Sequence, residues 1–273
     1  MIHIDHLKKR VMTQFSLECS LDIPKGVITG IIGMNGAGKS TLFKSILGIN
    51  PIDEGNIQIP DKQDIGVVLS ETGFSEFFTV SDIISILKCT YKHFDEDCFD
   101  LIVSVLISPL DKKTRTFSTG MKAKLNIIIA LTHHAKLLIL DEPTAGLDVL
   151  TRDEILDILR DYMEKEDCTI LISSHISSDL ESLCDDLYII DHGQIIMHEE
   201  MDTLLSQYGV LKVSKEDYKS LDKDYLLEVM KEPFGYSCLT NVRQFYSENY
   251  PTIVIEQNHI DTMIPILLKG ERL

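Results

Sequence analysis

The sequence predicts an α/β fold built on a mainly parallel sheet, and two observations support this prediction. Short, mainly apolar runs have the character of buried strands, and they occupy 27–32, 64–69, 137–140 and 169–173. Amphipathic helical patterns separate these runs, as over 40–47 and 152–164. Strands that alternate with helices favour parallel pairing through crossover connections.

Other segments extend this core. Residues 2–7 and 15–23 alternate between apolar and polar side chains, which predicts half-buried strands in an antiparallel N-terminal part. Residues 72–116 have mostly helical character, and a helix is expected after Thr119. His133 and His134 fall where that helix should end, so we interpret both as helix C-terminal cations.

The pattern changes near residue 207, and this change sets the predicted domains. Strands are expected at 209–213 and 252–255, and helices at 215–221 and 260–268. We therefore predict a first domain over 1–206, with a helical subdomain at about 72–134. A small α+β accessory region is expected over 207–273.

Charge excludes several classes of protein. The chain has 273 residues, of which 43 are acidic and 26 basic, for a formal net charge of −17. This acidity argues against a free-standing nucleic-acid binder and against direct docking on anionic lipid. The segments 1–50 and 111–150 are nevertheless net basic, so anions are expected to bind there.

Cysteine usage and hydropathy indicate an intracellular chain. The six cysteines are scattered and form no C-x-x-C pair, which is typical of reduced thiols. The N-terminus has no apolar signal-peptide core. No stretch approaches the roughly 18 uninterrupted apolar residues that a membrane-spanning helix needs.

A glycine-rich segment between a predicted strand and a predicted helix fits the phosphate-loop pattern G-x-x-x-x-G-K-[ST]. Backbone N–H groups of such a loop surround phosphate oxygens, and the helix N-terminus adds partial positive charge. Lys39 would reach the β- and γ-phosphates, and the Ser40 hydroxyl would bind Mg²⁺. The candidate nucleotide-binding residues here are Gly33, Asn35, Gly36, Ala37, Gly38, Lys39, Ser40 and Thr41.

A second strand carries paired carboxylates at its end. Residues 136–142 read KLLILDE, which places Asp141 at the carboxyl edge of the sheet, beside the phosphate loop. Asp141 would bind the Mg²⁺ shell, and Glu142 could polarise an attacking water. Without the loop, two solvated acids that end a strand would be the alternative interpretation.

Five motifs together resemble the ATP-binding cassette (ABC) ATPases over residues 1–206. Besides the loop and LLILDEP, they are Phe117-Ser118-Thr119-Gly120-Met121, Ala145-Gly146-Leu147-Asp148 and Ser174-His175. Their order and spacing are those of the family. Within it, the chain looks most like ATPase subunits of bacterial ABC-2-type exporters.

The resemblance implies a role for each matching residue. Asp141 would be the Walker B carboxylate, Glu142 the general base and His175 the switch histidine near the γ-phosphate. Ser118 and Gly120 would belong to the signature motif, which in this family binds ATP held by an opposing subunit. Asp148 would lie in the D-loop across that interface. Each chain would therefore carry two half-sites, and hydrolysis would need a dimer.

Three departures from the family pattern bear on the site. Ser70 stands where the family usually has a glutamine that binds the metal, so it is a candidate metal residue that could reach the Mg²⁺ shell only through water. Glu71 follows it and could replace the glutamine instead if the register shifts by one residue. The signature has Thr119 where its first glycine is usual. Val11 occupies the position of the aromatic that usually stacks on adenine, so we expect contact with the base, no stacking, and loose base selectivity.

The resemblance implies an Mg²⁺-dependent ATPase that is the energising subunit of an exporter. Its partners would be a second cassette, as homodimer or heterodimer, and separate membrane permease subunits. It would be cytoplasmic and peripheral on the inner face of the membrane. Two alternatives stay open: a soluble ABC ATPase of an assembly machine, and a degenerate cassette that binds ATP and regulates a partner.

Overall fold

The computed structural model describes residues 2–11, 15–69, 74–92, 94–95, 99, 112–165, 167–256 and 259–272. These residues form two compact units. The first consists of Met1–His175 with Tyr188–Ile195, and the second of Ile176–Leu187 with Ile196–Leu273. Among the described residues, no helix has the length and apolar character to cross a membrane.

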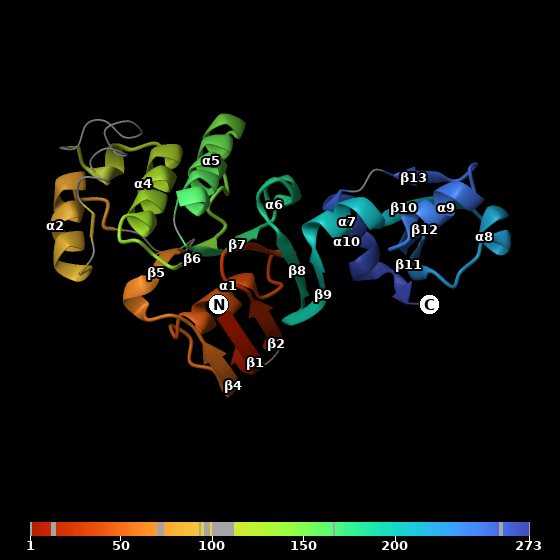
Figure 1. The fold of residues 1–273 in the computed structure, drawn as a ribbon, viewed down its shortest axis with the longest axis horizontal. Coiled ribbons are helices and arrows are strands. Elements are labelled where there is room, and N and C mark those ends of the chain that lie inside the picture. The colour runs from red at the N-terminus through yellow and green to blue at the C-terminus, as the bar shows by residue number, and fades with distance from the viewer. Residues whose placement is uncertain are drawn as a thin grey trace. The chain divides into compact units, whose positions relative to one another are not determined.

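The core of the first unit is a nine-stranded sheet with the order β4-β1-β2-β9-β8-β3-β7-β6-β5 (Figure 1). The strands β3, β7, β6 and β5 are parallel neighbours, and β3, β6 and β7 are buried along their whole length. This confirms the α/β prediction. The strands are β1 Ile2–Val11, β2 Phe15–Ile23, β3 Ile28–Ile32, β4 Glu54–Gln58, β5 Ile65–Val68, β6 Leu137–Asp141, β7 Thr169–Ser174, β8 Asp186–Asp191 and β9 Gln194–Glu200.

The N-terminal strands have one buried face, as their alternating pattern predicted. Ile2, Ile4 and Leu7 of β1 are buried while residues between them reach solvent. β1 pairs antiparallel with β2 on one side and with β4 on the other. The pairing of Val11 with Phe15 closes the β1–β2 ladder, which brings the two positions side by side.

Helices of the first unit begin where the sequence supplies caps or phosphate-loop glycines. They are α1 Lys39–Ile46, α2 Val80–Thr90, α4 Thr119–Leu131 and α5 Val149–Lys165, with short 3-10 turns η1 Lys62–Asp64 and η2 Thr114–Thr116. Thr79 and Asp82 form a capping box at the start of α2. Residues of α2 and α4 share a hydrophobic cluster of their own.

His133 corrects one interpretation. It is buried, its ring stacks on Tyr91 with centroids 4.0 Å apart, and burial lowers the pKa of its imidazole. His133 is therefore a neutral packing residue rather than a helix C-terminal cation. His134 is exposed and lies 3.5 Å from a carboxylate oxygen of Asp95.

The second unit contains a five-stranded antiparallel sheet with the order β13-β10-β12-β11-β14. The run β10-α8-β11-β12-α9-β13 has the β-α-β-β-α-β order of a ferredoxin-like unit. Four elements of the second unit match segments that the sequence predicted, namely β10, α8, β13 and α10. Its elements are α6 Ser177–Leu183, α7 Met201–Gln207, β10 Gly209–Ser214, α8 Asp217–Ser220, β11 Leu226–Lys231, β12 Gly235–Thr240, α9 Arg243–Asn249, β13 Val254–Glu256, α10 Ile260–Lys269 and β14 Glu271–Arg272.

The division between the units differs from the boundary expected after residue 206, because α6 and α7 group with the C-terminal strands. Glu181 of α6 shows why. Its carboxylate accepts the backbone N–H of Ile260 at 2.6 Å and lies 3.1 Å from Nδ1 of His259, so α6 caps the start of α10.

Candidate functional site

The phosphate loop connects β3 to α1 in the first unit. Gly36 and Gly38 have φ of 85° and 118°, a backbone region that favours glycine, so these positions allow the chain to curl back over the helix N-terminus. Gly33 is buried, and an added Cβ there would lie 2.3 Å from the carbonyl oxygen of Ile190. The loop thus has the glycines its geometry needs.

Lys39 lies almost completely buried at the start of α1, with 5% of its surface exposed. Its Nζ donates to the carbonyl oxygen of Gly33 at 2.7 Å and lies 3.2 Å from Oε1 of Glu142. A buried ammonium needs such partners because an unpaired charge away from water is costly. The loop lysine and the candidate base are therefore directly paired.

Glu142 follows β6 in a left-handed backbone conformation, with φ of 55°. Such a conformation costs a non-glycine residue about 1–3 kcal/mol and is concentrated at functional sites. Its N–H lies 3.2 Å from the carbonyl oxygen of Ser173, and its Oε2 contacts Nδ1 of His175. One carboxylate thus bridges the loop lysine and the predicted switch histidine.

Asp141 ends β6 and is 1% exposed. The hydroxyl of Ser173 on the neighbouring strand β7 donates to its Oδ1 at 2.7 Å. Ser40 is half-buried at the start of α1. A carboxylate and a hydroxyl are oxygen ligands of the kind that Mg²⁺ prefers, so the residues present fit that ion.

A hollow of about 210 Å³ lies in front of these residues. Seven of the predicted residues line it, whereas Gly33 and Ala37 are buried in the loop behind. Phe15, which sequence reasoning missed, is among the lining residues, and Val11 is not. The lining consists of Phe15, Met34, Asn35, Gly36, Gly38, Lys39, Ser40, Thr41 and Glu142.

The signature and D-loop residues form a second group on α4 and α5. Ser118 is exposed and caps α4, where its Oγ accepts the N–H of Met121 at 3.2 Å. A Cβ on Gly120 would come within 2.9 Å of Cγ2 of Thr151. Asp148 accepts the N–H of Thr151 at 3.0 Å and its hydroxyl at 2.8 Å, and these bonds lower the pKa of Asp148.

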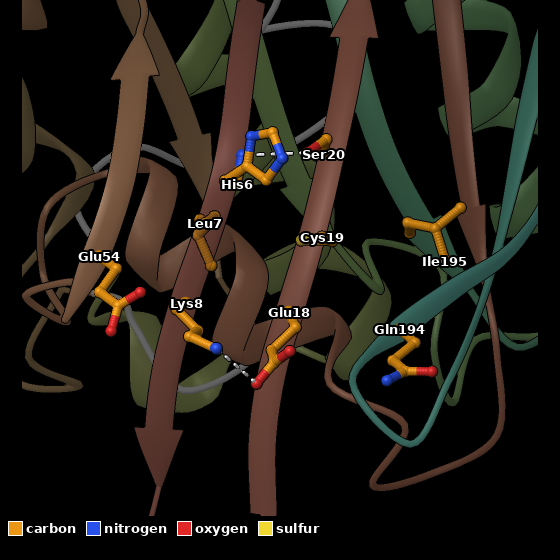
Figure 2. Close-up of a pocket in the computed structure, with 9 residues that line it drawn as sticks. All are labelled: His6, Leu7, Lys8, Glu18, Cys19, Ser20, Glu54, Gln194 and Ile195. Atoms are coloured by element: carbon orange, nitrogen blue, oxygen red, sulfur yellow. Dashed lines mark hydrogen bonds and ion pairs between the residues drawn. The ribbon is translucent and has the colours of Figure 1, made fainter.

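Ser70 and Glu71, the positions of the predicted metal-proximal departure, lie outside the described residues. A further hollow of about 570 Å³ is lined by residues of β1, β2, β4 and β9 (Figure 2). Lys8 and Glu18 form an ion pair of 3.4 Å within it. None of the predicted site residues lines this hollow.

Comparison with known proteins identifies the family. The ABC transporter family model matches residues 17–145. A lantibiotic transport ATP-binding protein of Streptococcus pyogenes, SrtF, is 35% identical, with 74% of this chain and 92% of that protein covered. The chain belongs to the ATP-binding proteins of ABC transporters, and it is an ATPase.

Another relative and two solved structures are also similar to this chain. The ABC transporter ATP-binding protein YtrB of Bacillus subtilis is 30% identical over 76% of this chain and 75% of that protein. An ATP-binding subunit of an ABC transporter matches with a TM-score of 0.67 and 25% identity, covering 76% of this chain and 92% of that one. A dimeric cassette bound to ADP and Pi has the same fold, at a TM-score of 0.65 and 19% identity over 74% and 99%.

Proposed function

We propose that this ATPase is the energising subunit of a bacterial exporter, and that it hydrolyses ATP as a dimer bound to separate membrane permease subunits. One observation carries the catalytic part: Glu142 contacts both Lys39 and His175 at the mouth of the phosphate loop. A relative named for lantibiotic transport supports an export role.

The chemistry follows from these contacts. Lys39 and the loop N–H groups bind the β- and γ-phosphates, which then replace Glu142 as the partner of the lysine. Glu142, released from that pair, accepts a proton from the attacking water. His175 contacts this carboxylate, so it would hold the base in position and lie near the terminal phosphate.

Asp141 and Ser40 would hold Mg²⁺, which supplies charge neutralisation for the phosphates. Ser173 positions the Asp141 carboxylate through its 2.7 Å hydrogen bond.

The second half-site supports the dimer. Ser118 and Thr119 are exposed at the N-terminus of α4, whose free N–H groups and partial positive charge suit an anion. In the family that the chain resembles, this anion is the γ-phosphate of ATP bound to an opposing cassette. The two groups of residues on one chain therefore serve two different nucleotides.

Replacement of Glu142 with glutamine tests the catalytic assignment. Glu142→Gln keeps the side-chain size but removes the proton acceptor, so we expect hydrolysis to fall at least about a hundredfold while ATP binding persists. Size-exclusion chromatography with ATP should show a stable dimer. Asp157→Asn, a change to an exposed acid on α5, serves as the matched control. A variant that remains monomeric at saturating ATP would contradict the dimer.

The export role has a separate test. Tagged protein purified from its source cells in mild detergent should carry an integral membrane protein in stoichiometric amount. If the chain co-purifies only with soluble proteins, the assembly-machine interpretation replaces the exporter.

A further inference from the structure

We propose that Phe15 supplies the aromatic surface against which the sugar and base of the nucleotide bind, in place of the aromatic that the sequence lacks at Val11. Phe15 is the one aromatic side chain among the described residues that line the phosphate-loop hollow. The inference rests on the ATP binding that the family shows.

The β1–β2 hairpin places this ring at the loop. Phe15 is the first residue of β2, and it pairs with Val11, the last residue of β1. Its ring atom Cζ lies only 3.0 Å from the point where a Cβ on Gly38 would stand. Because Gly38 immediately precedes α1, the ring lies beside the loop backbone that would surround the phosphates.

The hollow has the two kinds of surface that a nucleotide needs. Lys39 and Glu142 form a charged part that suits the terminal phosphates and the reacting water. Phe15 adds an apolar, planar surface to the same hollow, and Met34, an apolar loop residue that is 61% exposed, also lines it. A nucleotide joins a polyanion to an aromatic base, so its two ends match these two surfaces.

A stacking surface of this kind predicts loose base selectivity. Every base has a π-face, so an aromatic ring holds purines without reading their edges. ATP and GTP should therefore depend on Phe15 to a similar extent. Stacking on Phe15 would allow this cassette to hold its nucleotide although position 11 carries a valine and no aromatic side chain.

Phe15 also packs against the hydrophobic core, so the experiment must separate binding of the base from support of the loop. Inorganic tripolyphosphate makes this separation because it has the phosphates and neither sugar nor base. The comparison is between Phe15→Ala and the wild type, with Phe15→Tyr as the variant that keeps the ring. Affinities come from displacement of a fluorescent ATP analogue.

We expect Phe15→Ala to weaken ATP and GTP about three- to tenfold, as the loss of one aromatic contact predicts, and to leave tripolyphosphate binding unchanged. Phe15→Tyr should bind all three ligands as the wild type does. An equal loss for tripolyphosphate would show that Phe15 only supports the loop. Unchanged ATP affinity in Phe15→Ala would also overturn the proposal.

A spectroscopic test uses the absence of tryptophan from the chain. Phe15→Trp introduces a single indole, whose emission should change when ATP is added and stay constant when tripolyphosphate is added. Phe234→Trp is the control, since Phe234 is an exposed aromatic of the second unit. A Phe15→Trp signal that responds equally to tripolyphosphate would contradict stacking. Failure of the wild type to bind ATP at all would instead refute the ATPase function.

Discussion

The Nζ of Lys39 lies 3.2 Å from Oε1 of Glu142, so the lysine of the phosphate loop and the candidate base form an ion pair in this structure. The same carboxylate contacts His175. In the mechanism proposed above, binding of the γ-phosphate would exchange one anionic partner of the lysine for another. This exchange would couple the release of the base to the arrival of the substrate.

Removal of the lysine should expose this coupling. Lys39→Ala deletes the cation that binds the phosphates, so we expect the Kd for ATP to rise more than about tenfold and hydrolysis to be lost. Isothermal titration calorimetry with ATP measures the first effect. Lys62→Ala, which removes an exposed cation of η1, is the control. ATP affinity within twofold of the wild type would contradict the role of Lys39.

The sequence was sufficient to predict that the charged residues of the candidate site lie together. Lys39, Glu142 and His175 each follow a buried strand, and parallel strands bring their carboxyl ends to one edge of the sheet. Local motif and topology therefore determine these positions together. The fold class follows from the same buried strands.

Phe15 could not be predicted in this way, because its role depends on the register between β1 and β2. Other misses have local causes. The segment of β4, EGNIQ, is too polar to indicate a strand, and it lies at the sheet edge. In β12, GYSCLT is largely buried on both faces, so the alternation that identifies a strand is absent.

The contact between Asp148 and Thr151 predicts a pH-dependent stability. The hydrogen bonds from Thr151 lower the pKa of Asp148, so they stabilise the fold only while that carboxylate is ionised. The contribution is present above the unfolded pKa of about 3.9 and is lost as pH falls through the folded value. We expect Thr151→Val to lower the urea midpoint at pH 7 but not in acid.

Thr151→Ser is the matched variant, because it keeps the hydroxyl that donates to Asp148. It should restore both the midpoint and its dependence on pH. The deficit of Thr151→Val persisting unchanged below pH 3 would show that the methyl group, and not the hydrogen bond, stabilises this turn.

Burial of His133 also makes the stability depend on pH, but here the folded state favours the uncharged form of the side chain. Burial lowers the pKa of this imidazole, so the unfolded chain takes up a proton that the folded chain excludes. Stability is then lost as pH falls below the pKa of about 6.5 that histidine has in the unfolded chain, by at most about 1.4 kcal/mol for each pH unit.

The variant His133→Phe keeps a ring to stack on Tyr91 and cannot titrate. Between pH 7.5 and 5.5, the wild type should lose more free energy of unfolding than His133→Phe, by at most about 1.4 kcal/mol. Urea denaturation at the two pH values measures this difference, and parallel losses in both proteins would show that His133 is protonated in the folded state.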